Sequence, residues 1–195
     1  MIRENLSQAS NQDWGGEDAY PTNQYQLFVG QASSLPLKLR DAQLKVTYRN
    51  LPHWELEGAV YFITFNTWEK LELTPAARQV VLNACKFFDR QRYQIFSLVV
   101  MPDHVHMLMQ PLEKSDNKFW SLSSILHSMK SYSSKQMPKV MKHIGTVWQD
   151  ERHDHIVRDE REFKVFWEYI RQNPVKAGLS VTPEEYPFFW QMSEV

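Results

Sequence analysis

The feature that most constrains the fold is a pair of apolar runs separated by a two-residue turn. The first run is QIFSLVVM (94–101) and the second is HVHMLMQ (104–110), with Pro102 and Asp103 between them. Runs of β-branched and large apolar residues that are bounded by turn residues predict buried strands. Because the connection is so short, we expect the two strands to pair as an antiparallel hairpin.

One strand and one helix are predicted before this hairpin. The strand is AVYFITFN (59–66), which is rich in β-branched and aromatic residues. The helix is expected to begin after Thr74, since threonine is a good N-cap and Pro75 suits the first helical position. Apolar residues then recur at helical spacing from 77 to 88.

A helix, a strand and a further helix are predicted after the hairpin. Apolar residues at helical spacing over 122–132 indicate the first helix, which Pro138 is expected to end. A strand is expected within 147–157, most clearly at its last two residues. Asp159 is expected to cap the final helix, with Glu162 completing a capping box.

The predicted order of elements gives the fold class. Strand, helix, strand, strand, helix, strand is the ferredoxin-like split βαβ arrangement of the α+β class, an antiparallel sheet with helices on one face. The final helix is an addition to that arrangement. We expect this domain to span 51–195. Residues 1–50 are rich in Gln, Asn, Ser and Gly, so we expect an extension that is partly disordered or wrapped on the domain, with room for one or two short strands.

Composition excludes several classes of protein. In 195 residues, 43% are hydrophobic, which is enough for an ordinary core and rules out a chain disordered throughout. The single cysteine, Cys85, excludes a disulfide scaffold and a cysteine-rich zinc site. No run of 18 apolar residues and no apolar segment at the N-terminus are present, which favours a cytoplasmic protein without a membrane partner.

Charge is balanced over the chain but uneven along it. The net charge is −1, yet the stretch 121–149 contains Lys130, Lys135, Lys139 and Lys142 and no Asp or Glu. Such a stretch can form a phosphate-binding stripe. It can equally be a solvated helix face whose charge partners come from other parts of the chain. The sequence leaves both interpretations open.

Two histidines stand at the start of the second hairpin strand. His104 and His106 are separated by one residue, so both side chains lie on the same face of a strand, roughly 7 Å apart at their Cβ atoms. Their ring nitrogens can converge on one ion, in which case we expect them within about 4 Å of each other. A metal site would still need a third ligand. The alternative is two partly buried histidines with hydrogen-bond partners.

The last predicted helix carries a tyrosine and an asparagine on one face. Tyr169 and Asn173 are four residues apart, and Glu162 lies in line with both. Tyr169 falls at the flank of the apolar stripe, between core and solvent. It can therefore be an ordinary rim residue, and Asn173 with Pro174 can be the N-cap and first turn of another short helix.

Four runs together resemble a known family. VVMPDHVHMLMQP resembles the His-hydrophobe-His signature of the HUH single-tyrosine transposases, and WEYIRQNPVKAGL resembles the tyrosine helix of their REP-associated tyrosine transposase branch. LPHWELEGAVYFITF and VWQDERHDHIVRDEREF resemble the opening strand of that branch and its approach to the final helix. The runs occur in the order of the family, between residues 50 and 190.

The resemblance implies a small endonuclease and strand transferase acting on single-stranded DNA. At matching positions, Tyr169 is the nucleophile that forms a 5′-phosphotyrosine intermediate, and His104 and His106 are metal ligands. Asn173 occupies the place where relatives supply a third ligand as Gln or Asn. Mg²⁺ or Mn²⁺ is the expected ion. Asp103 stands where many relatives carry Asn, and no role is assigned to it.

The resemblance also implies the partners. Single-stranded or hairpin DNA, in particular palindromic repeat hairpins, is the expected substrate, and relatives include monomers and homodimers. Within such a family the lysine-rich helix is expected to lie beside the active site as a DNA surface. The competing hypothesis is a domesticated DNA-binding protein of the same fold, which recognises repeat hairpins without mobilising DNA.

Overall fold

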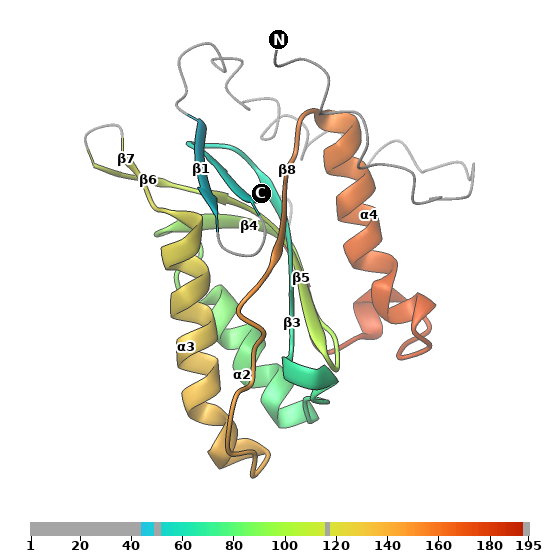
Figure 1. Ribbon diagram of the computed structural model, residues 1–195. Coiled ribbons are helices and arrows are strands. Elements are labelled where there is room, and N and C mark those ends of the chain that lie inside the picture. Colours follow the sequence, from blue (N-terminus) through green and yellow to red (C-terminus); the bar gives the residue numbers. More distant parts are fainter. Residues whose placement is uncertain (1–43, 49–51, 116–117, 193–195) are drawn as a thin grey trace.

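The structure is a computed structural model that describes residues 44–48, 52–115 and 118–192, with side chains described from residue 55 onward. Figure 1 gives the arrangement of the elements. In chain order these are β1 (Leu44–Tyr48), β2 (Pro52–Leu56), β3 (Tyr61–Asn66), η1 (Trp68–Lys70), α2 (Pro75–Lys86), β4 (Tyr93–Val100), β5 (His104–Pro111), β6 (Glu113–Ser115), β7 (Lys118–Phe119), α3 (Leu122–Val140), β8 (His153–Ile156), α4 (Glu160–Lys176), η2 (Pro183–Glu185) and β9 (Phe189–Gln191).

The central sheet has five strands in the order β8-β3-β5-β4-β9, and every neighbouring pair is antiparallel. The first four strands in that order, with α2 and α3 as the connecting helices, make up the predicted split βαβ fold. The fold class is therefore confirmed. The strand β9 adds a fifth member beside β4 that the sequence did not predict.

The predicted hairpin forms the centre of this sheet. Its strands β4 and β5 pair up to Val100 and Val105, and Met101 N–H donates to the His104 carbonyl at 2.8 Å across the turn. The observed bounds of both strands differ from the predicted ones by one residue at most. The register shifts between Ile95 and Ser97, where one strand carries an irregularity.

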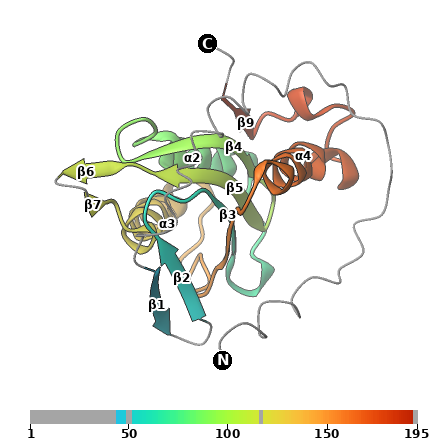
Figure 2. The ribbon, with the colours of Figure 1, turned by 90° about the horizontal axis from the view of Figure 1, so that it is seen from above.

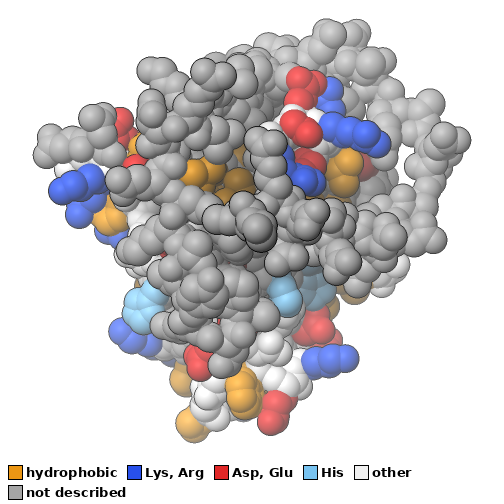
Figure 3. Space-filling model, turned by 45° about the horizontal axis from the view of Figure 1, so that its top comes forward, with side chains coloured by type: hydrophobic (Ala, Val, Ile, Leu, Met, Phe, Trp, Pro, Cys, Tyr) orange, Lys and Arg blue, Asp and Glu red, His pale blue; other side chains and the backbone are white. Residues whose placement is uncertain are grey.

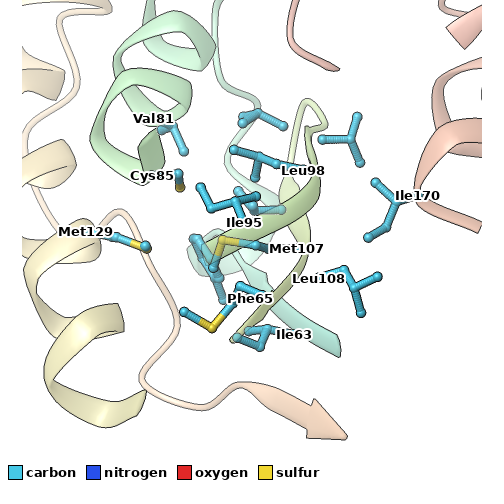
Figure 4. Close-up of a cluster of buried hydrophobic side chains, with 14 of the residues drawn as sticks. Ile63, Phe65, Val81, Cys85, Ile95, Leu98, Met107, Leu108, Met129 and Ile170 are labelled. Carbon is cyan, nitrogen blue, oxygen red and sulfur yellow. The ribbon is translucent and has the colours of Figure 1, made fainter. Parts of the chain in front are cut away.

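The helices lie on both faces of the sheet. In Figures 1 and 2, α2 and α3 cover one face and α4 covers the other. Figure 4 shows the consequence for the core, since Met129 of α3 approaches from one side and Ile170 of α4 from the other. Strand side chains such as Phe65 and Met107 fill the layer under α2 and α3, and both are almost fully buried. The final helix thus completes a three-layer domain.

The predicted helix starts are correct, with one difference in detail. Thr74 Oγ1 accepts from Ala77 N–H at 3.3 Å at the start of α2, and Asp159 Oδ1 accepts from Glu162 N–H at 2.8 Å at the start of α4. The reciprocal half of the predicted capping box is replaced, because the Glu162 carboxylate accepts from the Arg158 N–H at 2.9 Å. The Glu162 N–H in the first turn of this helix thus still has a side-chain acceptor, the Asp159 carboxylate.

The prediction that Pro138 ends its helix is wrong. Helix α3 continues to Val140, with Pro138 inside its last turn. A proline removes one N–H donor and disturbs the carbonyl four residues earlier, but it leaves the following donors intact. Met141 N–H accordingly donates to the Met137 carbonyl at 3.0 Å and closes the helix.

The predicted strand within 147–157 is the edge strand β8, His153–Ile156, which pairs with β3. On the N-terminal side, β1 pairs with β2 and so joins residues on both sides of the predicted boundary at residue 50. Residues 1–43 of the predicted extension lie outside the described residues. None of the described helices combines the length and the apolar composition needed to cross a membrane.

Candidate active site

The two histidines of β5 point to the same face of the sheet, as their spacing predicted. His104 pairs with Asn66 and His106 with Thr64 on β3, and the two imidazole centroids are 4.6 Å apart with a 68° angle between the rings. Both rings lie on the α4 side, because Met107, the next residue along β5, faces α2 and α3, and the ring of Tyr169 on α4 contacts that of His106. The strand therefore brings two imidazole rings together on one face.

His106 is almost fully buried, with 5% of its surface exposed. Burial lowers the pKa of His106 to about 3, and the neighbouring His104 lowers it further in the same direction. The ring is therefore neutral at physiological pH. A neutral imidazole keeps one nitrogen lone pair, which is the form that binds metal ions.

Each histidine is held through its Nδ1 atom. Asp103 Oδ1 lies 2.6 Å from His104 Nδ1, and Thr64 Oγ1 lies 2.7 Å from His106 Nδ1. A carboxylate only accepts, so His104 Nδ1 carries its hydrogen and the lone pair is on Nε2. Partners of this kind orient metal-ligating histidines in many proteins. The sequence alone gives no role for Asp103 and does not reveal Thr64, whose contact depends on the register of β3 against β5.

Helix α4 brings Tyr169 to the histidine pair. The Tyr169 Oη atom is 3.4 Å from His106 Nε2, and the two ring centroids are 5.0 Å apart. Burial raises the pKa of the Tyr169 phenol, and a hydrogen bond with the Asn173 side chain opposes that shift. The hydroxyl is therefore protonated at neutral pH and stands directly at the nitrogen of His106 that Thr64 leaves open.

A stack of aromatic rings fixes α4 against this part of the sheet. The ring of Phe62 on β3 stacks on Phe166 of α4 with centroids 4.3 Å apart and 7° between the planes. Phe62 also stacks on His106 at 5.6 Å and meets Tyr169 edge-on at 5.7 Å. Phe62 and Thr64 share one strand face, and Phe166 and Tyr169 are one helical turn apart. The stack therefore aligns the tyrosine with the histidines.

Asn173 lies one turn beyond Tyr169 and hydrogen-bonds its hydroxyl. The alternative in which Asn173 and Pro174 open a separate short helix is wrong, because α4 runs without interruption to Lys176. The structure thus connects His106, Tyr169 and Asn173 in one series of side-chain contacts. Among the described residues, no group of three His, Cys, Asp or Glu side chains is placed to hold a metal ion.

Glu162, which was predicted to share a helix face with Tyr169, has other partners. Its carboxylate accepts from Arg158 Nε at 2.8 Å and lies 3.2 Å from His155 Nε2. Burial acts to raise the pKa of Glu162, but these hydrogen bonds outweigh it and lower the pKa to about 2. Glu162 therefore serves the first turn of α4 rather than the histidine pair.

The structure does not bring the four predicted DNA-binding lysines together with the histidine pair. Helix α3 covers the face opposite α4, so the expected position beside the active site is wrong. Lys130 Nζ donates to the Gln149 carbonyl at 2.8 Å, and Lys139 Nζ donates to Gln136 at 3.1 Å. Lys135 lines a groove between α2 and α3, and Lys142 follows the end of α3.

In Figure 3 the coloured basic side chains stand at several separate places, and acidic side chains lie among them. A stripe of four lysines does not form among the described residues, because Lys130 and Lys135 line two different grooves along α3. The alternative of a solvated helix face thus describes Lys139 and Lys142 better than a continuous phosphate stripe does.

Comparison with known proteins identifies a family that this chain matches. The model of the family "Transposase IS200 like" matches residues 69–173, more than half of the chain. A Haemophilus influenzae protein provisionally named REP-associated tyrosine transposase is 24% identical over 146 residues, covering 68% of this chain and 79% of that protein. The Escherichia coli REP-associated tyrosine transposase is 25% identical over 138 residues, covering 68% and 76%.

A solved structure is similar in fold. It is described as a REP-associated tyrosine transposase bound to a REP hairpin, and it matches with a TM-score of 0.59 and 24% identity, covering 73% of this chain and 81% of the other. The region matched by the family model contains both histidines, Tyr169 and Asn173. The resemblance found in the sequence motifs is therefore confirmed.

Proposed function

The chain belongs to the IS200-like family of transposases, and on that basis we propose that it cleaves and rejoins single-stranded DNA through Tyr169. The observation that carries the proposal is the position of the Tyr169 hydroxyl, 3.4 Å from Nε2 of the buried His106 of the same chain. A phenol next to an imidazole nitrogen of a histidine pair supports a role as nucleophile beside a metal site.

We propose that His104, His106 and Asn173 hold a divalent cation, Mg²⁺ or Mn²⁺. The residues fit such an ion, because Asp103 and Thr64 occupy the two Nδ1 atoms and burial keeps His106 neutral. The amide oxygen of Asn173 is a suitable hard ligand. When bound, the ion supplies Lewis-acid stabilisation of the scissile phosphate.

The reaction at Tyr169 is a phosphoryl transfer. The bond from Tyr169 Oη to phosphorus forms, and the bond from phosphorus to the 3′ oxygen of the preceding nucleotide breaks. The phenol gives up its proton to water, and the leaving 3′ oxygen takes up a proton from water. The products are a 5′-phosphotyrosine and a free 3′-OH. Because the phosphodiester energy is kept in the tyrosine link, a 3′-OH can reverse the step without a nucleotide cofactor.

The proposed substrate is a hairpin with single-stranded flanks. Its support is the similar solved structure, whose description states that it holds a REP hairpin. We propose that Lys130 and Lys135, which line two grooves along α3, contact phosphates of flanking DNA and contribute to salt-dependent binding, whereas Lys139 and Lys142 belong to the solvated face of the helix. Residues 51–195 are proposed to be sufficient for the chemistry.

The test is a covalent adduct with DNA. A 3′-labelled hairpin oligonucleotide incubated with the wild-type protein and Mn²⁺ is expected to give a labelled protein band, whereas Tyr169→Phe should give none and still bind the DNA. The Phe variant keeps the ring that packs on Phe62 and His106. If the wild type binds hairpins but forms no adduct on any of them, the protein is a DNA-binding member of the family without cleavage activity.

A further inference from the structure

A groove lies between α2 and α3, on the opposite side of the sheet from Tyr169. Its volume is about 500 Å³, and it is lined by both helices and by the start of β4. The residues that matter here are Phe87, Phe88, Arg92, His127, Tyr132 and Lys135. Neither the histidine pair nor α4 contributes to it, so it is separate from the candidate active site.

Two aromatic side chains of this groove are unusually exposed. Phe87 is 70% exposed and Tyr132 is 56% exposed, although large apolar side chains normally gain free energy from burial. Trp68 is the other aromatic among the most exposed large hydrophobic residues of the described chain. Two such rings on facing helices offer flat surfaces for stacking.

The charged side chains that line this groove are all basic. Arg92, His127 and Lys135 line the groove, and its described lining contains no Asp or Glu. The Arg92 guanidinium lies over the Phe88 ring, 3.5 Å from its centroid, and 4.5 Å from the centroid of Trp120. Cations interleaved with aromatic rings form the kind of surface that binds a single strand, since bases stack and phosphates meet the cations.

We infer that this groove binds unpaired nucleotides of a DNA strand, with bases stacked on Phe87 and Tyr132 and phosphates near Arg92 and Lys135. The inference rests on the proposed function, because the strand is a continuation of the DNA that Tyr169 cleaves. A polyanion fits the groove better than an apolar protein helix does, since such a helix would leave the charges of Arg92 and Lys135 beside it without compensation.

The position of the groove determines how it acts. The strand must pass an edge of the sheet to reach it from the active site, so only DNA with a long enough single-stranded flank can occupy both. Short substrates are bound at the active site alone. The groove therefore makes affinity depend on flank length, and it extends the site without contributing to the chemistry.

The experiment compares flank lengths in a protein that cannot cleave. Binding of hairpins with successively longer single-stranded flanks to Tyr169→Phe is measured by fluorescence anisotropy, with and without Phe87→Ala and Tyr132→Ala. Affinity should rise once the flank reaches the groove, and each alanine should weaken long-flank binding about 5- to 100-fold. Short-flank binding should be unchanged.

Matched variants separate stacking from a general effect. Tyr132→Phe keeps the ring and should bind as the parent does. Val181→Ala is the control outside the groove, because it removes an apolar side chain that is 82% exposed elsewhere on the surface. Lys135→Gln should lower the log–log salt slope for long flanks by about 0.7. If the parent and the Phe87→Ala/Tyr132→Ala variant bind long flanks equally, the inference that the groove binds DNA is wrong. It is also wrong if the variant loses the same affinity for short and for long flanks.

Failure of the groove is distinguishable from failure of the proposed function. The covalent adduct of the otherwise wild-type protein on a short-flank hairpin depends on Tyr169 and not on the groove. If the adduct forms but the alanine variants keep their affinity for long flanks, DNA binding by the groove is rejected and the proposed cleavage is retained. Loss of long-flank affinity in those variants, without any wild-type adduct, supports the groove and rejects cleavage.

Discussion

The two faces of the central sheet differ although they belong to the same strands. On β5, Val105, Met107 and Met109 are fully buried and alternate with His104 and His106. Met107 points toward α2 and α3, whereas the ring of His106 contacts Tyr169 of α4. Alternation along a strand makes this separation possible, since neighbouring residues serve opposite layers. One strand therefore supplies both the core and the candidate site.

The difference comes from how each face is covered. Two helices seal the face of Ile63 and Phe65, and the side chains there are apolar and buried. A single helix covers the other face, where Phe62 and Thr64 stay partly exposed. Polar residues with specific partners can occupy that face because the cover is incomplete. Stability is expected to depend on the first face and chemistry on the second.

The largest effect on activity is expected from His106→Ala, on the face toward α4. Loss of one of the few proposed ligands should abolish Mn²⁺-dependent cleavage while the circular dichroism spectrum stays that of the wild type. Oligonucleotide cleavage and Mn²⁺ titration measure this effect. Cleavage near the wild-type rate by a folded His106→Ala variant would remove this residue from the site.

On the opposite face, Met107→Ala should act on stability. Met107 is fully buried in the layer under α2 and α3, and truncation of such a side chain costs about 2–5 kcal/mol. Urea denaturation should show the loss of unfolding free energy, and the protein that remains folded should bind Mn²⁺ as the wild type does. A larger effect on Mn²⁺ affinity than on stability would contradict the division between the two faces.

Thr64→Val tests the hydrogen bond that holds His106. Valine keeps the shape of the side chain but removes the hydroxyl 2.7 Å from His106 Nδ1. Loss of such a partner typically weakens metal binding about 10- to 100-fold, whereas Thr64→Ser should retain it. Isothermal titration with Mn²⁺ in the absence of DNA gives this affinity directly. Equal affinities of the Val and Ser variants would exclude a positioning role for Thr64.

The smallest effect is expected at the start of α4, through pH. The pKa of Glu162 is lowered from its ordinary value of 4.5 to about 2 by its partners, chiefly Arg158. The carboxylate therefore stabilises the fold above about pH 4.5, and this contribution is lost as the pH falls toward 2. Arg158 is exposed to solvent, which limits the contribution to about 1 kcal/mol or less.

Thermal melts at two pH values measure this contribution. Glu162→Gln should melt below the wild type at pH 7, and the difference should shrink at pH 3. A difference that is constant with pH would mean that the carboxylate charge plays no part in holding α4.

The sequence predicted the elements whose signals are local. The apolar runs on either side of Pro102 and Asp103 formed the hairpin, and Thr74 and Asp159 capped their helices. The predicted helix end at Pro138 is wrong, because whether a helix continues past one missing N–H donor depends on how the following turn packs. The three-residue strand β9 is too short to leave a periodic pattern.

The site was predicted in part for the same reason. The facing of His104 and His106 follows from strand alternation, and the proximity of Tyr169 and Asn173 follows from helical spacing. The contact between the histidine pair and the pair on α4 does not follow from such local spacing, because it requires the Phe62–Phe166 stack that positions α4. Thr64 and the opposite location of α3 likewise depend on register and layer order, which a single sequence does not reveal.

The most direct test of the central claim identifies the residue that becomes joined to DNA. After reaction of the wild-type protein with a hairpin oligonucleotide, trypsin and nuclease digestion and mass spectrometry locate the residual nucleotide. The peptide VFWEYIR (165–171) contains one tyrosine, Tyr169, so the modified peptide identifies it without ambiguity. The account predicts the nucleotide on this peptide. Modification of Tyr132 or Tyr186 in its place, with VFWEYIR unmodified, would contradict it.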